Sequence, residues 1–158
     1  MANGPHPQTA SLEALIGVWR TEGEVLGEDG ETVAQTFSGT DTYEWLGQFF
    51  VIHRVDVTFG EDHIENLEMI GPYDGERGAF LTTVYDGASA EVERSIATVD
   101  DAGVWAFRSG EGASRGESTL RVDERGEHMH AAWSRTEDDG TTWRPWMRVT
   151  LTRTPMSR

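Results

Sequence analysis

The histidine at position 53 is the side chain in this sequence best placed to do chemistry. It shares one face of a predicted strand with large apolar residues at alternate positions, namely Phe49, Val51, Val55, Val57 and Phe59. An imidazole there could orient a ligand, act as a general acid or base, or bind haem iron as an axial ligand. The alternative is a buried histidine that hydrogen-bonds to a neighbouring strand. Both interpretations place His53 inside the fold.

Aromatic and methionine side chains, most of them on predicted inward faces, are the other candidates for contact with a ligand. Together with His53 they form our predicted ligand-binding set, which is completed by Tyr43, Met69, Trp105, Trp133 and Met147. Aromatic residues also dominate core packing, so packing alone would explain several of these positions. Tyr85 is a second candidate acid or base. The predicted strands over 63–71 and 79–86, which contain Met69 and Tyr85, are apolar on both faces, so the inward face of each stays open.

Three further polar residues could bind a ligand or a metal ion, but each also has a purely structural explanation. Arg135 follows Trp133 on one predicted face, where a buried guanidinium would need Glu68 or a ligand carboxylate, whereas an exposed strand end would need neither. His128 and His130 have the spacing of two metal ligands on one strand. Because zinc sites need three or four ligands, we interpret them as a surface pair and predict no metal site.

The composition excludes several classes of chemistry. The chain has 158 residues, no cysteine, and 28 acidic against 13 basic residues, all of them arginine, for a net charge of −15. Without cysteine there is no thiolate nucleophile or zinc–thiolate site, and without lysine there is no Schiff base or P-loop. So acidic a surface makes nucleic acid and anionic membranes poor partners. The motifs G-x-S-x-G, H-E-x-x-H and G-x-G-x-x-G are missing as well.

The elements that position these side chains are predicted to be strands. Beyond Gly17 the sequence alternates apolar and polar residues in short runs separated by Gly and Asp turns. We predict strands over residues 18–26, 32–45, 48–59, 63–71, 79–86, 90–99, 103–109, 115–122, 128–137 and 143–153. One short helix is predicted over 11–16, with Ser11 as its N-cap. Residues 1–10 are expected to be a flexible lead-in, and 11–158 a single domain.

Ten strands joined by hairpins predict an all-β fold. An up-and-down antiparallel barrel is favoured because closure removes both sheet edges, with the short helix across one end. A two-sheet sandwich is the alternative. A barrel of about ten strands is wide enough to enclose a small ligand.

Two motifs at opposite ends of the chain resemble the lipocalin, or calycin, arrangement. Gly17-Val-Trp19 opens the first strand and Leu151-Thr-Arg153 closes the last. The resemblance implies that Trp19 plugs one barrel end while Arg153 packs across its ring. Tyr43-Glu-Trp-Leu-Gly47 and the segment from Asp139 to Arg153 extend the similarity to a bacterial lipocalin-like family of undefined function, over about residues 12–155. Nitrobindin-type haem barrels are more distant, since their G-x-W-x-G-x-G opening is not matched at 17–23.

These observations predict binding of a small, mainly hydrophobic molecule in a barrel cavity. One alternative is an isomerase or cyclase that uses His53 or Tyr85 in the same cavity, and another is a haem or gas-binding barrel with His53 on the iron. The first residues lack the charged and apolar regions of a secretory signal, so we expect a cytoplasmic protein. The oligomeric state and the identity of the ligand stay open.

Overall fold

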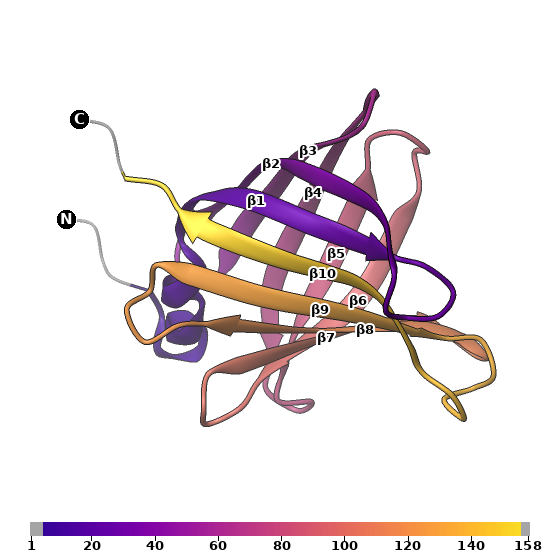
Figure 1. Ribbon diagram of the computed structural model, residues 1–158. Coiled ribbons are helices and arrows are strands. Elements are labelled where there is room, and N and C mark those ends of the chain that lie inside the picture. The colour runs from indigo at the N-terminus through magenta and orange to yellow at the C-terminus, as the bar shows by residue number, and fades with distance from the viewer. Residues whose placement is uncertain (1–4, 156–158) are drawn as a thin grey trace.

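A computed structural model describes residues 5–155, which form a closed barrel of ten antiparallel strands with one short helix at one end (Figure 1). In chain order the elements are η1 (Pro7–Leu15), β1 (Gly17–Leu26), β2 (Val33–Leu46), β3 (Phe50–Phe59), β4 (Asp62–Asp74), β5 (Ala79–Asp86), β6 (Val92–Val99), β7 (Val104–Glu111), β8 (Ser114–Val122), β9 (His128–Thr136) and β10 (Arg144–Arg153). The predicted all-β, up-and-down architecture is thereby confirmed.

The sheet is closed by the pairing of its first and last strands. Each strand pairs with the next one in the chain, and β1 pairs with β10 so that Trp19 lies opposite Arg153. Every strand therefore has a hydrogen-bonded neighbour on both sides, which is how a barrel avoids exposed edges. Glycines supply the positive φ that several of the tight turns require, for example Gly60 with φ 59° between β3 and β4.

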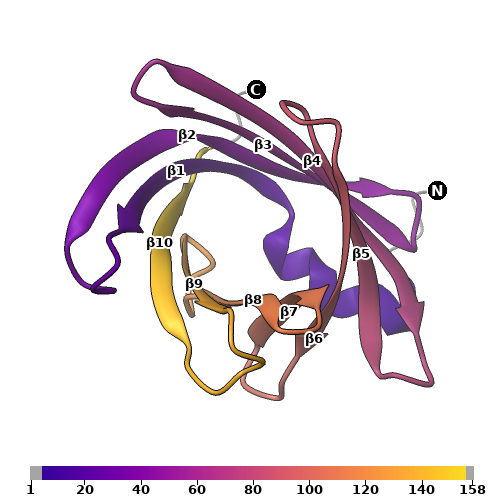
Figure 2. The same ribbon diagram turned by 90° about the vertical axis from the view of Figure 1, so that its right-hand side faces the viewer.

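The helix differs from the sequence-based expectation in its type and its start. It is a 3-10 helix that begins at Pro7, so the lead-in expected over residues 1–10 is already helical from that residue. Proline suits the first helical position, and the His6 side chain accepts a hydrogen bond from the Gln8 backbone N–H at 3.2 Å. Leu12 and Leu15 are fully buried, and in the view along the barrel the helix lies behind its interior (Figure 2).

Alternate residues of each strand face the interior, and the layer of the interior next to the helix is mainly apolar. It contains Val51, Ile70, Phe80, Trp105 and Met129, each at most 2% exposed, together with the fully buried Trp19. In β5, and in β4 as far as Ile70, the even-numbered residues face inward. A bulge between Ile70 and Tyr73 then brings Tyr73 against the inward-facing Phe80. Phe49 was expected to face inward as well. It instead precedes β3, is 46% exposed, and packs against the His6 ring.

Within residues 5–155, no helix has the length and apolar character needed to cross a membrane.

Candidate functional site

The barrel contains a cavity of about 560 Å³ beyond the apolar layer. Its lining extends along the barrel. At one end are Thr21 and Leu151, a pair that lies two residues along β1 and β10 from Trp19 and Arg153. At the other end are Ser109, Ser114 and Arg135, near the ends of β7, β8 and β9. The cavity therefore lies on the far side of the buried layer from the helix. The β7–β8 hairpin, which contributes Ser109, Gly110 and Ser114 to the lining, lies at the end of the barrel that faces the viewer in Figure 2.

A cluster of charged side chains forms the floor of this cavity. The Nε2 atom of His53 lies 2.6 Å from Oδ2 of Asp41, and its Nδ1 atom lies 2.9 Å from Oε1 of Glu68. The three side chains are 9 to 13% exposed. They come from three neighbouring strands, because β3 carries His53 between Asp41 on β2 and Glu68 on β4. The histidine therefore joins the strands on either side of it.

Two more residues fix the geometry of the floor. Thr21 on β1 donates its hydroxyl proton to Oδ1 of Asp41, so this carboxylate is held by partners on both sides. The Tyr43 ring stacks on the His53 ring with centroids 4.0 Å apart and planes 9° apart. Burial, with the nearby charges of Asp41 and Glu68, raises the pKa of Tyr43 well above its usual value, which keeps the phenol neutral.

The two carboxylates determine the protonation state of His53. Burial by itself lowers the pKa of the imidazole, but hydrogen bonds and charge attraction from Asp41 and Glu68 outweigh it and raise the pKa to about 9. At neutral pH the ring is an imidazolium that donates one N–H to each carboxylate. The floor is thus an ion-paired triad of two carboxylates and one cation.

This arrangement determines what His53 can do chemically. An axial haem ligand or a general base needs a ring nitrogen with a free lone pair, and both nitrogens of His53 are bonded to carboxylates. Holding haem iron would require one of these buried pairs to break, which is costly for the partner left behind. The residues at the floor do not fit haem ligation by His53.

The predicted ligand-binding residues separate into three groups. Four of them line the cavity, namely Tyr43, His53, Trp133 and Met147. Trp105 lies outside the lining, 1% exposed in the layer next to the helix, where it packs against Phe80. Met69 lies on the opposite face of β4 from the lining residue Glu68, so it points out of the barrel.

The position of Tyr85 corrects its assignment as a candidate acid or base in the cavity. Its neighbour Val84 lines the cavity, so Tyr85 lies on the outer face of β5, where it is 48% exposed. Both faces of this strand are apolar, so the sequence did not decide whether Tyr85 points inward or outward. The register with β4 decides it, because Val84 pairs with Glu68.

Arg135 lies at the mouth of the cavity rather than in its interior. The side chain is exposed, and its guanidinium carbon lies 4.4 Å from the centroid of the Trp146 ring. Glu68, one of its two predicted partners, instead bonds to His53. The exposed strand-end interpretation of Arg135 is therefore the one that the geometry matches.

Sequence reasoning missed Asp41 and Asn66, which both line the cavity. The sequence contained a signal for Asp41, because it lies at an even spacing from Phe37 and Tyr43 and therefore on the same inward face of β2. An inward-facing carboxylate in the strand next to a buried histidine specifically indicates an internal ion pair. The pairing of strands was needed to see it.

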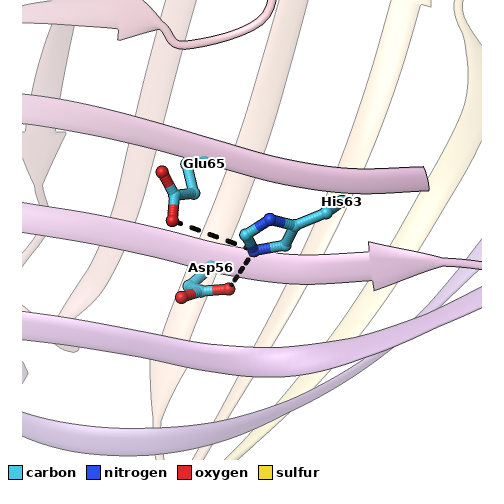
Figure 3. A group of neighbouring side chains, drawn as sticks. All are labelled: Asp56, His63 and Glu65. Carbon is cyan, nitrogen blue, oxygen red and sulfur yellow. Dashed lines mark hydrogen bonds and ion pairs between the residues drawn. The ribbon is translucent and has the colours of Figure 1, made fainter.

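Ionisable groups also gather on the outer surface. Asp56, His63 and Glu65 lie together on β3 and β4, where His63 Nε2 is 2.6 Å from Oδ1 of Asp56 and 3.9 Å from Oε1 of Glu65 (Figure 3). All three are exposed, so solvent satisfies them without a bound ion. His128, from the predicted surface pair, bonds to Asp123 at 3.0 Å.

Comparison with known proteins places these features in a family. The model of a family described as "Protein of unknown function (DUF1579)" matches residues 4–153. Rv2717c from M. tuberculosis is 12% identical, with a TM-score of 0.68, and the match covers 96% of this chain and 99% of that one. The S-type phycobiliprotein lyase CPES from Guillardia theta is 9% identical, with a TM-score of 0.65 and coverage of 97% and 100%. No curated protein sequence matches this chain. At these identities the two structures show a shared calycin-like fold.

Proposed function

This chain belongs to the DUF1579 family, and we propose that it binds a small, mainly hydrophobic molecule inside its barrel. The observation that carries the proposal is the cavity of about 560 Å³. Pockets that hold small molecules are typically ~300 to 1,000 Å³ and combine apolar walls with a few placed polar groups. This cavity lies within that range.

The walls are suited to an apolar ligand body. Above the charged floor the lining includes large apolar and aromatic side chains from seven strands, among them Phe37, Val55, Val84, Phe107, Leu120, Trp133 and Met147. The floor is more polar than the sequence predicted, because His53 comes with Asp41 and Glu68 instead of being an isolated imidazole. A ligand would therefore lie with its apolar part against the walls and a polar end toward the triad.

Binding is favoured over catalysis by the same geometry. The catalytic alternative depended on His53 or Tyr85 as an acid or base. Both nitrogens of His53 are engaged by carboxylates, and Tyr85 lies on the outer face of the barrel. Neither group is free to exchange a proton with a molecule in the cavity.

A pair of adjacent substitutions tests the proposal. Val84→Trp places an indole in the cavity, whereas Tyr85→Trp places one on the outer face of the same strand. The neutral fluorescent probe N-phenyl-1-naphthylamine should bind the wild-type protein saturably. We expect Val84→Trp to weaken binding at least about tenfold and Tyr85→Trp to leave it unchanged, with both variants folded by circular dichroism. Unsaturable binding, or equal affinity in the two variants, would refute the proposal.

A further inference from the structure

The acceptor groups at the cavity floor outnumber their donors. In the triad, Oδ1 and Oδ2 of Asp41 and Oε1 of Glu68 all accept hydrogen bonds. Among the described residues none donates to the other oxygen of Glu68, Oε2. Two residues earlier on the same face of β4, the buried Oδ1 of Asn66 also has no partner. A buried polar atom such as the Asn66 oxygen normally finds a hydrogen-bond partner, so this position calls for a donor. Oε2 of Glu68 is a second acceptor on the same face of β4.

The formal charge of the floor points in the same direction. Two carboxylates surround one imidazolium, which leaves one net negative charge in a largely enclosed site. A buried charge without compensation is unfavourable, and a cation placed beside it would be stabilised. The protein as a whole carries a net charge of −15, so its field also concentrates cations rather than anions at the surface.

The three cationic side chains that line the cavity do not cancel this preference. The N–H groups of His53 are both directed at carboxylates, and one face of its ring is covered by Tyr43. Arg135 lies at the mouth, where its guanidinium packs over Trp146. Arg115, at the start of β8, pairs with Asp139 at 3.3 Å and has its guanidinium over the Trp143 ring. None of the three side chains is bonded to the acceptor atoms of Glu68 and Asn66.

From this geometry we infer that the ligand is a cationic amphiphile, an apolar molecule whose protonated amine binds at Glu68 and Asn66. The inference rests on the proposed function and specifies its ligand class. The ammonium would donate to Oε2 of Glu68 and to the side-chain amide oxygen of Asn66, while the apolar body would lie along the wall toward Trp133. A carboxylic acid of the same shape would meet the negative floor and be rejected.

Three probes with one ring system and different charges test the inference. They are 1-naphthylmethylamine, 1-naphthylmethanol and 1-naphthaleneacetic acid, which at neutral pH are cationic, neutral and anionic. Their affinities for the full chain can be measured by displacement of N-phenyl-1-naphthylamine. We expect the amine to bind about tenfold more tightly than the alcohol, as a charge-assisted hydrogen bond predicts, and the acid to bind most weakly. An acid that binds as tightly as the amine would overturn the inference without any variant.

Two substitutions on one strand locate the source of the preference. Glu68→Gln removes the charge at the floor, and Glu65→Gln removes the same charge from the exposed outer face. We expect Glu68→Gln to bring the affinity ratio of amine to alcohol close to one, and Glu65→Gln to preserve the tenfold ratio. Equal ratios in the two variants would contradict a floor site. If the alcohol binds but the amine shows no preference, this inference fails and the proposed function stands. If N-phenyl-1-naphthylamine does not bind at all, the proposed function itself fails.

Discussion

The guanidinium carbon of Arg153 lies 4.2 Å from the centroid of the Trp19 ring, and this contact holds the closed end of the barrel together. Trp19 is fully buried and donates its indole N–H to the Leu15 carbonyl at 2.9 Å. Arg153 donates to three backbone carbonyls, those of Ala14, Ile16 and Gly126. The pair therefore connects the helix, the first and last strands, and the β8–β9 turn.

Truncation of the tryptophan should destabilise the fold strongly. We expect Trp19→Ala to lower the free energy of unfolding by about 3–5 kcal/mol, because it leaves a large cavity and removes the surface on which Arg153 stacks. Chemical denaturation measures the loss. Trp143→Ala, at a position 40% exposed, should cost less than about 1 kcal/mol and serves as the control. Equal losses in the two variants would show that Trp19 is peripheral.

Replacement of the arginine by lysine tests geometry separately from charge. Arg153 uses all three of its nitrogens on separate carbonyls, and the single ammonium of lysine cannot reproduce that fork. We expect Arg153→Lys to lower the melting temperature and the free energy of unfolding, by about 1–3 kcal/mol. Arg148→Lys, on the exposed face of the same strand, should be nearly neutral. If Arg153→Lys leaves the free energy of unfolding unchanged, water hydrogen-bonds to these carbonyls as well as the guanidinium does.

A close approach of two strands makes Gly39 intolerant of any side chain. A Cβ atom there would lie 2.6 Å from the Val57 Cα and closer still to the Asp56 carbonyl oxygen, both of them backbone atoms. We expect Gly39→Ala to destabilise the protein by about 1–3 kcal/mol through overpacking. Gly75→Ala is the matched control, because its Cβ would meet nothing within 4 Å. Thermal melts of the two variants should differ by several degrees.

Much of the barrel could be predicted because its information is local. Period-two alternation and Gly or Asp turns locate all ten strands, and the predicted run over 128–137 ends one residue from the observed β9. The helix was predicted less well because its first turn depends on His6 and Pro7, outside the helical pattern over 11–16. Its cap is a histidine, a residue type that sequence rules do not favour at that position.

The site was predicted only in part because its chemistry lies between strands. Alternation placed His53 and Tyr43 inside, but the charge state of His53 depends on Asp41 and Glu68, which are 12 and 15 residues away. Register brings these side chains together, and a shift of one residue would turn them outward. Met69 and Tyr85 show the same limit, since apolar residues on both faces left no alternation from which to choose a direction.

The triad should make the folded protein less stable as the pH rises above neutral. Burial lowers the pKa of His53 in the folded protein, but the hydrogen bonds that the ring donates to Asp41 and Glu68 outweigh it and raise the pKa from 6.5 to about 9. A raised pKa means that the stabilisation is fully present below pH 6.5 and is lost as the pH rises through about 9. We expect a loss on the order of 3 kcal/mol over that interval, at about 1.4 kcal/mol per pKa unit. Denaturation curves recorded from pH 6 to pH 9.5 measure it, below the range where Tyr43 ionises.

Variants of the triad and of the surface separate this effect from other titrations. Glu68→Gln leaves His53 with a single carboxylate, so its pKa in the folded protein should fall, and the alkaline loss of stability should become smaller and be complete at lower pH. His63→Gln removes an exposed histidine whose pKa is also raised, chiefly by its hydrogen bond to Asp56, and should leave most of the loss in place. A nuclear magnetic resonance titration of the His53 ring gives the pKa directly. A wild-type protein whose stability is constant between pH 6.5 and 9, with the His53 ring neutral at pH 7, would contradict the ion-paired triad.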